Sequence, residues 1–269
     1  MTETKVIAEI GWNHMGDLAL AEQMIFSASK AGATWAKFQT WDVKRLASGP
    51  WDLDGRREIY EKAQLSLEKH NFLVEVCQKY NIKFLSSVFS IEDAKLLLSI
   101  GQTAVKIPSF EIANRDLLLF CSANFSNLFV STGTASSEEL FHLPSLVDLD
   151  RTTVLHCVSS YPCPLEMINL PRIGHLKSIF QSVGFSDHTL GVAASLFALS
   201  YNIDIIERHF TVDNSMPGRD NRFAILPDEL RYLVDKIAEF SKVNTDHGID
   251  YQSSEIEARE IYRARFNHG

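Results

Sequence analysis

The chain has 269 residues, of which 45% are hydrophobic and 22% are charged, a composition typical of globular proteins and not of disordered or fibrous ones. Its 34 acidic and 26 basic residues give a formal net charge of −8, so we expect neither nucleic acid nor an anionic membrane as a partner. A chain of this length has room for one large single domain, such as a barrel or a doubly wound sheet.

Eight short segments rich in β-branched and aromatic residues are spaced along the chain, and most of them are almost continuously apolar. Such segments are typical of parallel strands that are covered on both faces. The expected strands are Val6–Ile10, Trp35–Trp41, Ile82–Phe89, Ala104–Pro108, Leu128–Ser131, Thr153–Val158, Val183–Ser186 and Ile203–Phe210.

Segments with a helical period lie between these strands. Asp17 is placed to cap the first helix, Ser136 and Glu139 have the spacing of a capping box, and Pro227 marks the start of a final amphipathic helix. Eight strand–helix units of this length predict an α/β fold, a single-domain (β/α)8 TIM barrel over residues 1–245. A doubly wound open sheet is the alternative.

The four cysteines form no CxxC pair, which predicts free thiols in a reducing compartment. The first residues lack the apolar stretch of a signal peptide, and no apolar run approaches the ~20 residues of a membrane helix. We therefore expect a cytoplasmic protein.

Polar residues recur at the ends of the expected strands, where a TIM barrel carries its chemistry. Lys37 and Lys106 fall in the second and fourth strands, among several serines. Two cations and several hydroxyls at one barrel mouth would hold a phosphate and a carboxylate. Taken one at a time, each lysine could instead reach solvent and each serine cap a turn. The serines of this set are Ser87, Ser109, Ser131 and Ser186.

His188 and His209 belong to the last two strands, which neighbour each other in a barrel. Two imidazoles can hold one divalent ion and leave positions open for water and substrate oxygens, a ligand set that suits manganese. The alternative is that each histidine is a hydrogen-bonded core residue. Spacing alone does not exclude His14 and His156 as further ligands.

Glu9 is an acidic residue within an apolar strand. It is a candidate general acid or base or a clamp for sugar hydroxyls, and the alternative is a structural ion pair with one of the lysines. Asp187 or Glu207 would be the partner that orients the histidine rings.

Taken together, these motifs resemble the N-acetylneuraminate (sialic acid) synthase family, which includes synthases of related nonulosonic acids. The matching segments follow the family order over residues 6 to 240. They are Ala8–Asp17, Ala36–Thr40, Val105–Ser109, Val130–Gly133, Leu155–Pro162, Phe185–Leu190, Glu207–Thr211 and Met216–Asp220.

The resemblance implies a TIM barrel that condenses phosphoenolpyruvate with an N-acylamino aldose, N-acetylmannosamine or a related sugar, to give a nonulosonic acid and phosphate. It implies that His188 and His209 bind a divalent metal, usually Mn²⁺, with Mg²⁺ or Co²⁺ as alternatives. Glu9 and Asp220 match acids that hold the sugar or assist near the metal, and Tyr161 and Phe89 would form nearby walls. The residues expected around phosphoenolpyruvate are Lys37, Ser87, Lys106, Ser109, Ser131, Ser159 and Ser186.

Most members of this family continue past the barrel into a small antifreeze-like domain that reaches the partner's active site in their dimers. Residues 246–269 resemble the start of the linker to that domain, which we expect to be missing here. The expected partners are therefore phosphoenolpyruvate, the sugar, a second copy of the chain and a separate capping-domain protein.

Two other functions stay open at this point. One is a phosphoenolpyruvate-dependent 3-deoxy sugar acid synthase that uses a different aldehyde. The other is a non-catalytic binding or regulatory subunit.

Overall fold

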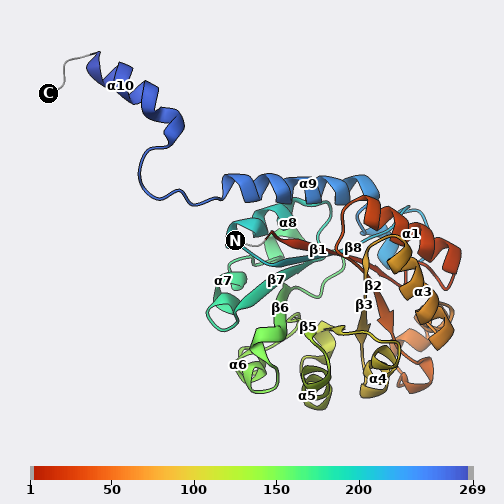
Figure 1. Ribbon diagram of the computed structural model, residues 1–269. Helices are drawn as coiled ribbons and strands as arrows, with labels where there is room; N and C mark the ends of the chain where they lie inside the picture. The colour runs from red at the N-terminus through yellow and green to blue at the C-terminus, as the bar shows by residue number, and fades with distance from the viewer. Residues whose placement is uncertain (1–2, 266–269) are drawn as a thin grey trace.

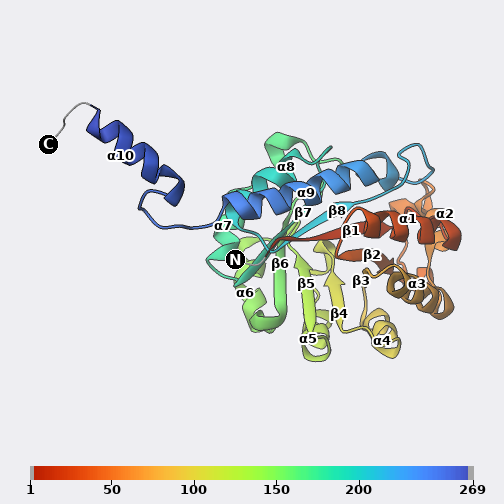
Figure 2. The same cartoon turned by 45° about the horizontal axis from the view of Figure 1, so that its top comes forward.

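A closed barrel of parallel strands forms the centre of the computed structural model, which describes residues 3–265 (Figures 1 and 2). Each strand pairs with the next along the chain, and β1 also pairs with β8, which closes the sheet. This closure confirms the predicted TIM barrel, and the doubly wound alternative is wrong. The strands are β1 (Lys5–Gly11), β2 (Trp35–Thr40), β3 (Lys83–Val88), β4 (Ala104–Ile107), β5 (Asn127–Ser131), β6 (Thr152–Cys157), β7 (Ser182–Asp187) and β8 (Ile205–His209).

Helices follow the strands and cover the outside of the barrel (Figure 2). One helix follows each strand except β2, after which two occur before β3. The helices of the barrel are α1 (Leu18–Lys30), α2 (Arg56–Ala63), α3 (Leu67–Lys79), α4 (Ile91–Ser99), α5 (Arg115–Asn124), α6 (Ser137–His142), α7 (Arg172–Lys177), α8 (Ala193–Ala198) and α9 (Pro227–Val243).

The predicted elements agree closely with the observed ones, and every strand boundary lies within two residues of its prediction. Asp17 caps α1 by accepting hydrogen bonds from the backbone of Ala19 and Leu20, and Ser136 and Glu139 form the capping box of α6. Local sequence signals place these helix starts because a side-chain oxygen satisfies backbone N–H groups that have no partner in the helix.

The barrel interior is built in two levels. Because strand side chains alternate between faces, residues two apart point the same way. The lower level is an apolar cluster of Ile7, Trp35, Leu85, Phe129, Leu155 and Ile205. Two residues further along the same strands stand Glu9, Lys37, Ser87, Ser131, Cys157 and Glu207. The apolar level therefore forms the floor beneath a polar level at the barrel mouth.

The chain after α9 leads to α10 (Ile256–Ala264), whose residues are all exposed and which lies apart from the barrel (Figures 1 and 2). The domain boundary at residue 245 stays a prediction. Residues 266–269 of the predicted tail lie outside the described residues.

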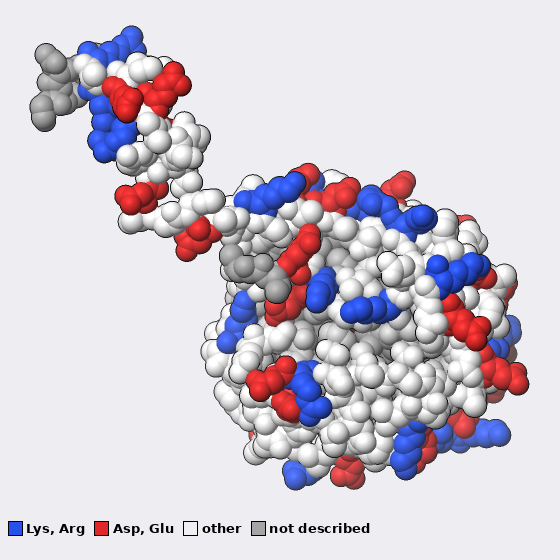
Figure 3. All heavy atoms as spheres, in the orientation of Figure 1, with Lys and Arg blue, Asp and Glu red and all other residues white. Residues whose placement is uncertain are grey.

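The distribution of charged side chains on the surface and the state of the cysteines can be compared with what the sequence predicts. Acidic and basic side chains are interspersed on the face seen in Figure 3, with wide uncharged areas between them. All four cysteines are free and buried, as predicted. Within residues 3–265, no helix is both long enough and apolar enough to cross a bilayer.

Gly184 gives a test of the packing between the strands that carry both candidate metal ligands. A Cβ atom on Gly184 would lie 2.7 Å from the backbone oxygen of Ile205 in β8. We expect Gly184→Ala to lower the free energy of unfolding by roughly 1–3 kcal/mol, because overpacking forces the backbone to move. Urea unfolding at neutral pH measures this effect.

Gly174 in α7 is the matched control, because a Cβ atom there would meet no atom within 4 Å. Gly174→Ala should be neutral or stabilising by up to about 1 kcal/mol, since alanine is the better helix former. Equal stability of both variants would contradict the close approach of β7 and β8.

Candidate functional site

The carboxyl ends of the strands surround one cavity of about 740 Å³. Its volume is in the range of small-molecule sites. Ser159 is the one predicted site residue that does not line it. The structure therefore brings together the residues lining the cavity, which are Glu9, Lys37, Ser87, Lys106, Ser109, Ser131, Tyr161, Ser186, His188, His209 and Asp220.

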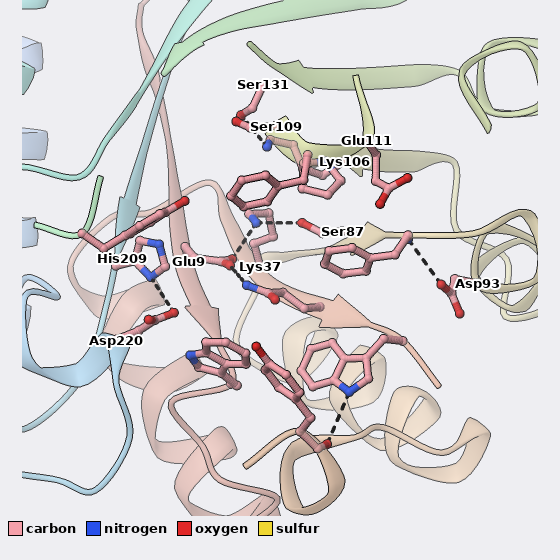
Figure 4. Close-up of a pocket in the computed structure, with 18 of the residues that line it drawn as sticks. Glu9, Lys37, Ser87, Asp93, Lys106, Ser109, Glu111, Ser131, His209 and Asp220 are labelled. Atoms are coloured by element: carbon pink, nitrogen blue, oxygen red, sulfur yellow. Dashed lines mark hydrogen bonds and ion pairs between the residues drawn. The ribbon is translucent and has the colours of Figure 1, made fainter. Parts of the chain in front are cut away.

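Lys37 is held by two side chains at the wall of the cavity (Figure 4). Its Nζ lies 2.7 Å from Glu9 Oε2 and donates to Ser87 Oγ at 3.0 Å. Gln39 Nε2 donates to the other oxygen of Glu9 at 2.7 Å. The structural ion pair considered for Glu9 is therefore present, and it places the carboxylate at the wall of the cavity.

Lys106 of β4 is held in a similar way. Its Nζ donates to Ser131 Oγ at 2.6 Å and lies 3.7 Å from Glu207 Oε1. The same Glu207 oxygen accepts a hydrogen bond from Ser186, and the other lies 3.7 Å from Lys37 Nζ. Glu207 thus lies between the two lysines.

The buried charges shift one another's pKa. Burial lowers the pKa of Lys37, but Glu207 and Glu9 outweigh this, so its pKa lies above the usual value. Burial raises the pKa of Glu207, but Lys106 and Lys37 outweigh this and lower it. Burial lowers the pKa of Lys106, with Glu207 opposing it. Glu207 and Lys37 are therefore held in their charged forms.

Backbone and hydroxyl groups extend the polar wall beside Lys106. Gly133 N donates to Ser109 Oγ at 3.0 Å, and Ser109 in turn donates to Cys157 Sγ at 3.4 Å. A Cβ atom on Gly133 would lie 2.2 Å from Ser159 Oγ and 2.7 Å from Ser109 Oγ. A glycine is therefore needed here for the two serine hydroxyls to stand side by side.

His188 and His209 lie close together at the mouth, at the ends of the neighbouring strands β7 and β8. Their ring centroids are 5.4 Å apart with 56° between the planes, and the Tyr161 ring lies 4.2 Å from that of His188. His209 Nδ1 lies 3.6 Å from Asp220 Oδ2 (Figure 4). Burial raises the pKa of Asp220 to about 7, and the nearby charge of Glu9 adds to this.

The donor chemistry of this pair fits a divalent metal. Burial, with the charges of His188 and Lys37, holds the pKa of His209 well below its usual value, so the ring stays neutral. When His188 is neutral, its Nδ1–H donates to the Val158 carbonyl at 2.9 Å, and the lone pair on Nε2 is then free to bind a metal ion.

Water and substrate oxygens would have to complete the coordination of such an ion. In the part of the chain that is described, no group of three His, Cys, Asp or Glu side chains is placed to hold a metal. An open site of this kind suits a Lewis acid and not a structural metal.

Cys157 is the buried thiol beside His188. Burial by itself raises the pKa of this thiol, but the charge of His188 and the hydrogen bonds with His188 and Ser109 lower it to about 7. Burial lowers the pKa of His188, and the opposing charge of Cys157 raises it above its usual value. No local sequence pattern predicts this pair, because the two residues are 31 positions apart.

Two predicted roles differ from the structure. Among the described residues, neither Asp187 nor Glu207 forms a hydrogen bond with a histidine ring: Asp187 pairs with Arg208, and Glu207 faces the lysines. His14 and His156 are core histidines outside the cavity. His14 accepts from the Gly16 backbone, and His156 donates to the Ile168 carbonyl.

An aromatic cluster forms the outer wall of the cavity, and of its members the sequence analysis expected only Phe89 near the site. Trp12 stacks on Tyr60 at 4.9 Å, and Trp41 packs edge-on against Tyr60 at 6.0 Å and Phe89 at 6.4 Å. These residues come from four separate segments, so no local pattern reveals them. We call Trp12, Trp41, Tyr60 and Phe89 the aromatic wall.

The charged groups near this wall are largely paired. Arg45 forms ion pairs with Asp93 and Asp42, and Arg56 pairs with Asp54. Two of the three arginines that line the cavity are therefore already paired with carboxylates, and the third is Arg219.

Comparisons with known proteins agree with one another. The sequence profile of the NeuB family matches residues 24–248. The N,N'-diacetyllegionaminic acid synthase of Campylobacter jejuni is 35% identical over 263 residues, which cover 91% of this chain and 79% of that protein. The pseudaminic acid synthase of the same organism is 32% identical over 276 residues, covering 97% and 80%.

A solved structure also resembles the fold. The crystal structure of N-acetylneuraminic acid (sialic acid) synthetase from Leptospira borgpetersenii in complex with citrate superposes with a TM-score of 0.89. It is 32% identical, and the match covers 98% of this chain and 92% of that one.

His156 gives a test of the buried histidines. Burial lowers its pKa from 6.5 to about 4, so between these values the unfolded chain binds a proton that the folded protein does not. Stability is therefore lost as the pH falls through this window, by roughly 3 kcal/mol at most for this residue. We expect His156→Gln to lose less stability than the wild type between pH 6.5 and pH 4.

Urea unfolding at pH 7, 6, 5 and 4 measures the difference. Glutamine keeps a donor for the Ile168 carbonyl but does not titrate. Parallel pH profiles of the two proteins would contradict the buried neutral state of His156.

Proposed function

Because the chain belongs to the NeuB family, we propose that it is a metal-dependent synthase that joins phosphoenolpyruvate to an N-acylamino aldose. The products are a nonulosonic acid and phosphate. The observation that carries the proposal is the pairing, in one cavity, of two facing imidazoles with two buried lysines. Anion binding and carbonyl activation are the two capacities that this reaction needs.

Lys37 and Lys106 would bind the phosphate and carboxylate of phosphoenolpyruvate. Both ammonium groups are buried and already placed by Glu9 and Glu207, so an anion meets donors that need little reorganisation. Ser87 and Ser131, which touch the two lysines, add hydroxyl donors, and Ser109 extends this set. The same donors would stabilise the negative charge on phosphate as its bond to C2 breaks.

His188 and His209 would hold the divalent ion, Mn²⁺ in our proposal. When bound, the ion supplies Lewis-acid polarisation of the aldehyde oxygen. Both imidazoles are buried beside Tyr161, which keeps bulk water away from this position.

In the reaction, C3 of phosphoenolpyruvate forms a bond to the aldehyde carbon, and the aldehyde oxygen takes a proton. Water then adds to C2 and loses a proton. The bond between C2 and the phosphate oxygen breaks as the C2 hydroxyl passes its remaining proton to the departing phosphate, which leaves the 2-keto acid. Asp220, with a pKa of about 7, is the group that we assign to the first proton transfer. We assign removal of the proton from this water to Glu9, which lies beside Lys37.

The aromatic wall would contact the far end of the sugar. Once the aldehyde carbon lies between His209 and the lysines, the remaining carbons and the acyl group extend towards Trp41 and Tyr60. Aromatic faces favour C–H groups and acyl methyls, and two of the three arginines that line the cavity are already paired with carboxylates. We therefore propose an uncharged N-acylamino aldose as the acceptor.

The partners beyond these substrates stay predictions. They are a homodimer and a separate capping protein. The cytoplasmic location and the choice of Mn²⁺ over Mg²⁺ or Co²⁺ also stay predictions.

The first test is phosphate release from phosphoenolpyruvate with Mn²⁺ and a panel of aldoses that includes N-acetylmannosamine. We expect release with at least one N-acylamino aldose, and none after His209→Ala, because that variant loses one of two protein ligands. Metal analysis should show less bound Mn²⁺, with the melting temperature nearly unchanged. A folded His209→Ala protein with wild-type activity would refute the metal assignment.

The panel separates the other functions. Turnover only with aldoses that carry no acylamino group would favour a 3-deoxy sugar acid synthase. Binding of phosphoenolpyruvate without turnover, even with a capping protein added, would favour the regulatory subunit.

The second test compares the two ends of the cavity. Lys106→Ala should raise the KM for phosphoenolpyruvate roughly ten- to hundred-fold, because a charge-assisted hydrogen bond contributes about 1.5–3 kcal/mol. Trp41→Ala should raise the KM for the aldose by roughly three- to ten-fold, in line with about 0.5–1.5 kcal/mol for aromatic contacts. Each variant should leave the other KM near the wild-type value, and a reversed pattern would place the substrates the other way round.

A further inference from the structure

A buried ion pair lies directly behind the two histidines. Arg208 Nη1 is 2.6 Å from Asp187 Oδ2, and both side chains are at most 1% exposed. The two residues are register partners across β7 and β8, and each immediately precedes one of the two histidines. Asp187 also bonds to Ser195 of α8, so the pair lies on the helix-facing side of the sheet.

This pair also anchors the backbone that follows β7. Thr189 N donates to Asp187 Oδ1 at 2.8 Å, and Arg208 Nη2 donates to the Thr189 carbonyl at 2.8 Å. His188 lies between the two residues that are held in this way. Its ring is fixed separately by the hydrogen bond to the Val158 carbonyl.

Stability alone gives a weak reason for charges at these positions. Taking two charges out of water costs several kcal/mol for each ion, and apolar replacements of buried pairs are often neutral or stabilising. Neighbouring helix-facing positions of the same strands are apolar, namely Val183, Phe185 and Ile206. What an ion pair provides here, and an apolar pair lacks, is a fixed direction for the backbone on both sides of the site.

We propose that Asp187 and Arg208 are positioning residues that set the spacing of the His188 and His209 rings for a single divalent ion. This inference rests on the metal site of the proposed function. The two ligands come from different strands, so their separation of 5.4 Å between ring centroids depends on how the ends of β7 and β8 are joined. The pair joins them one residue before each ring, and through Thr189 one residue after His188.

The test replaces the pair by apolar residues of similar size, Asp187→Leu with Arg208→Met, in the full chain. The affinity for Mn²⁺ is measured by calorimetry, the absorption spectrum is recorded with Co²⁺, and the melting temperature is measured without metal. We expect the affinity to fall roughly ten- to hundred-fold, the range known for groups that orient metal ligands, and the Co²⁺ spectrum to change. The melting temperature should stay within a few degrees of the wild type.

Asp204→Asn is the matched control at the opposite end of the same strands. Asp204 Oδ2 accepts hydrogen bonds from Ser182 Oγ at 2.9 Å and from the Val183 backbone at 3.1 Å. This variant should lower the melting temperature and leave the affinity for Mn²⁺ unchanged. Should the double variant fail to fold, Arg208→Lys keeps the charge but loses the second donor, and a smaller loss of affinity is expected.

Wild-type affinity in the apolar variant, or in a folded Arg208→Lys protein, would overturn the inference and leave the proposed function intact. An equal loss of affinity in Asp204→Asn would also overturn it, because general loosening of the strands would then explain the effect. A wild-type protein that binds neither Mn²⁺ nor Co²⁺ would remove the metal site and this inference together.

Discussion

Mutual neutralisation of four buried charges is the constraint on which the site depends. Glu9 and Glu207 face Lys37 and Lys106 inside the barrel, where an unpaired charge would be expensive to bury. Glu207 lies between the two ammonium groups and, together with Glu9, keeps Lys37 charged in the absence of an anion. In the proposed function, an incoming phosphate would meet these cations already in place and would need little rearrangement of the site.

The closed sheet makes this arrangement rigid. An apolar level beneath the charges seals the barrel, and the strand pleat brings the next inward-facing residues to the mouth. The pairing of β7 with β8 then brings two imidazoles together, with the ion pair of Asp187 and Arg208 on the opposite face of the sheet. Charged side chains thus lie on both faces of the sheet at the ends of these strands. Each of them is paired with a side chain of opposite charge.

Much of the site was predictable because its residues stand at strand ends, and strand ends in a barrel converge. Lys37, Lys106, His188 and His209 were found in this way and line the cavity. Of the aromatic wall only Phe89 was predicted, because Tyr60 comes from α2 and its contact with Trp12 depends on how that helix folds over the mouth. The predicted role of Asp187 was wrong because successive residues of a strand point to opposite faces of the sheet. Asp187 lies on the helix-facing side of β7 and not on the cavity side.

The sequence by itself determined the number and order of the strands and helices and the residues at the mouth, since hydrophobic period and capping act over a few neighbouring positions. Only the tertiary structure decided which carboxylate pairs with which lysine, that Cys157 lies against His188, and that Arg208 is buried with Asp187. These choices depend on contacts between strands far apart in the chain, and on a low-dielectric interior in which a difference of an ångström or two decides the partner.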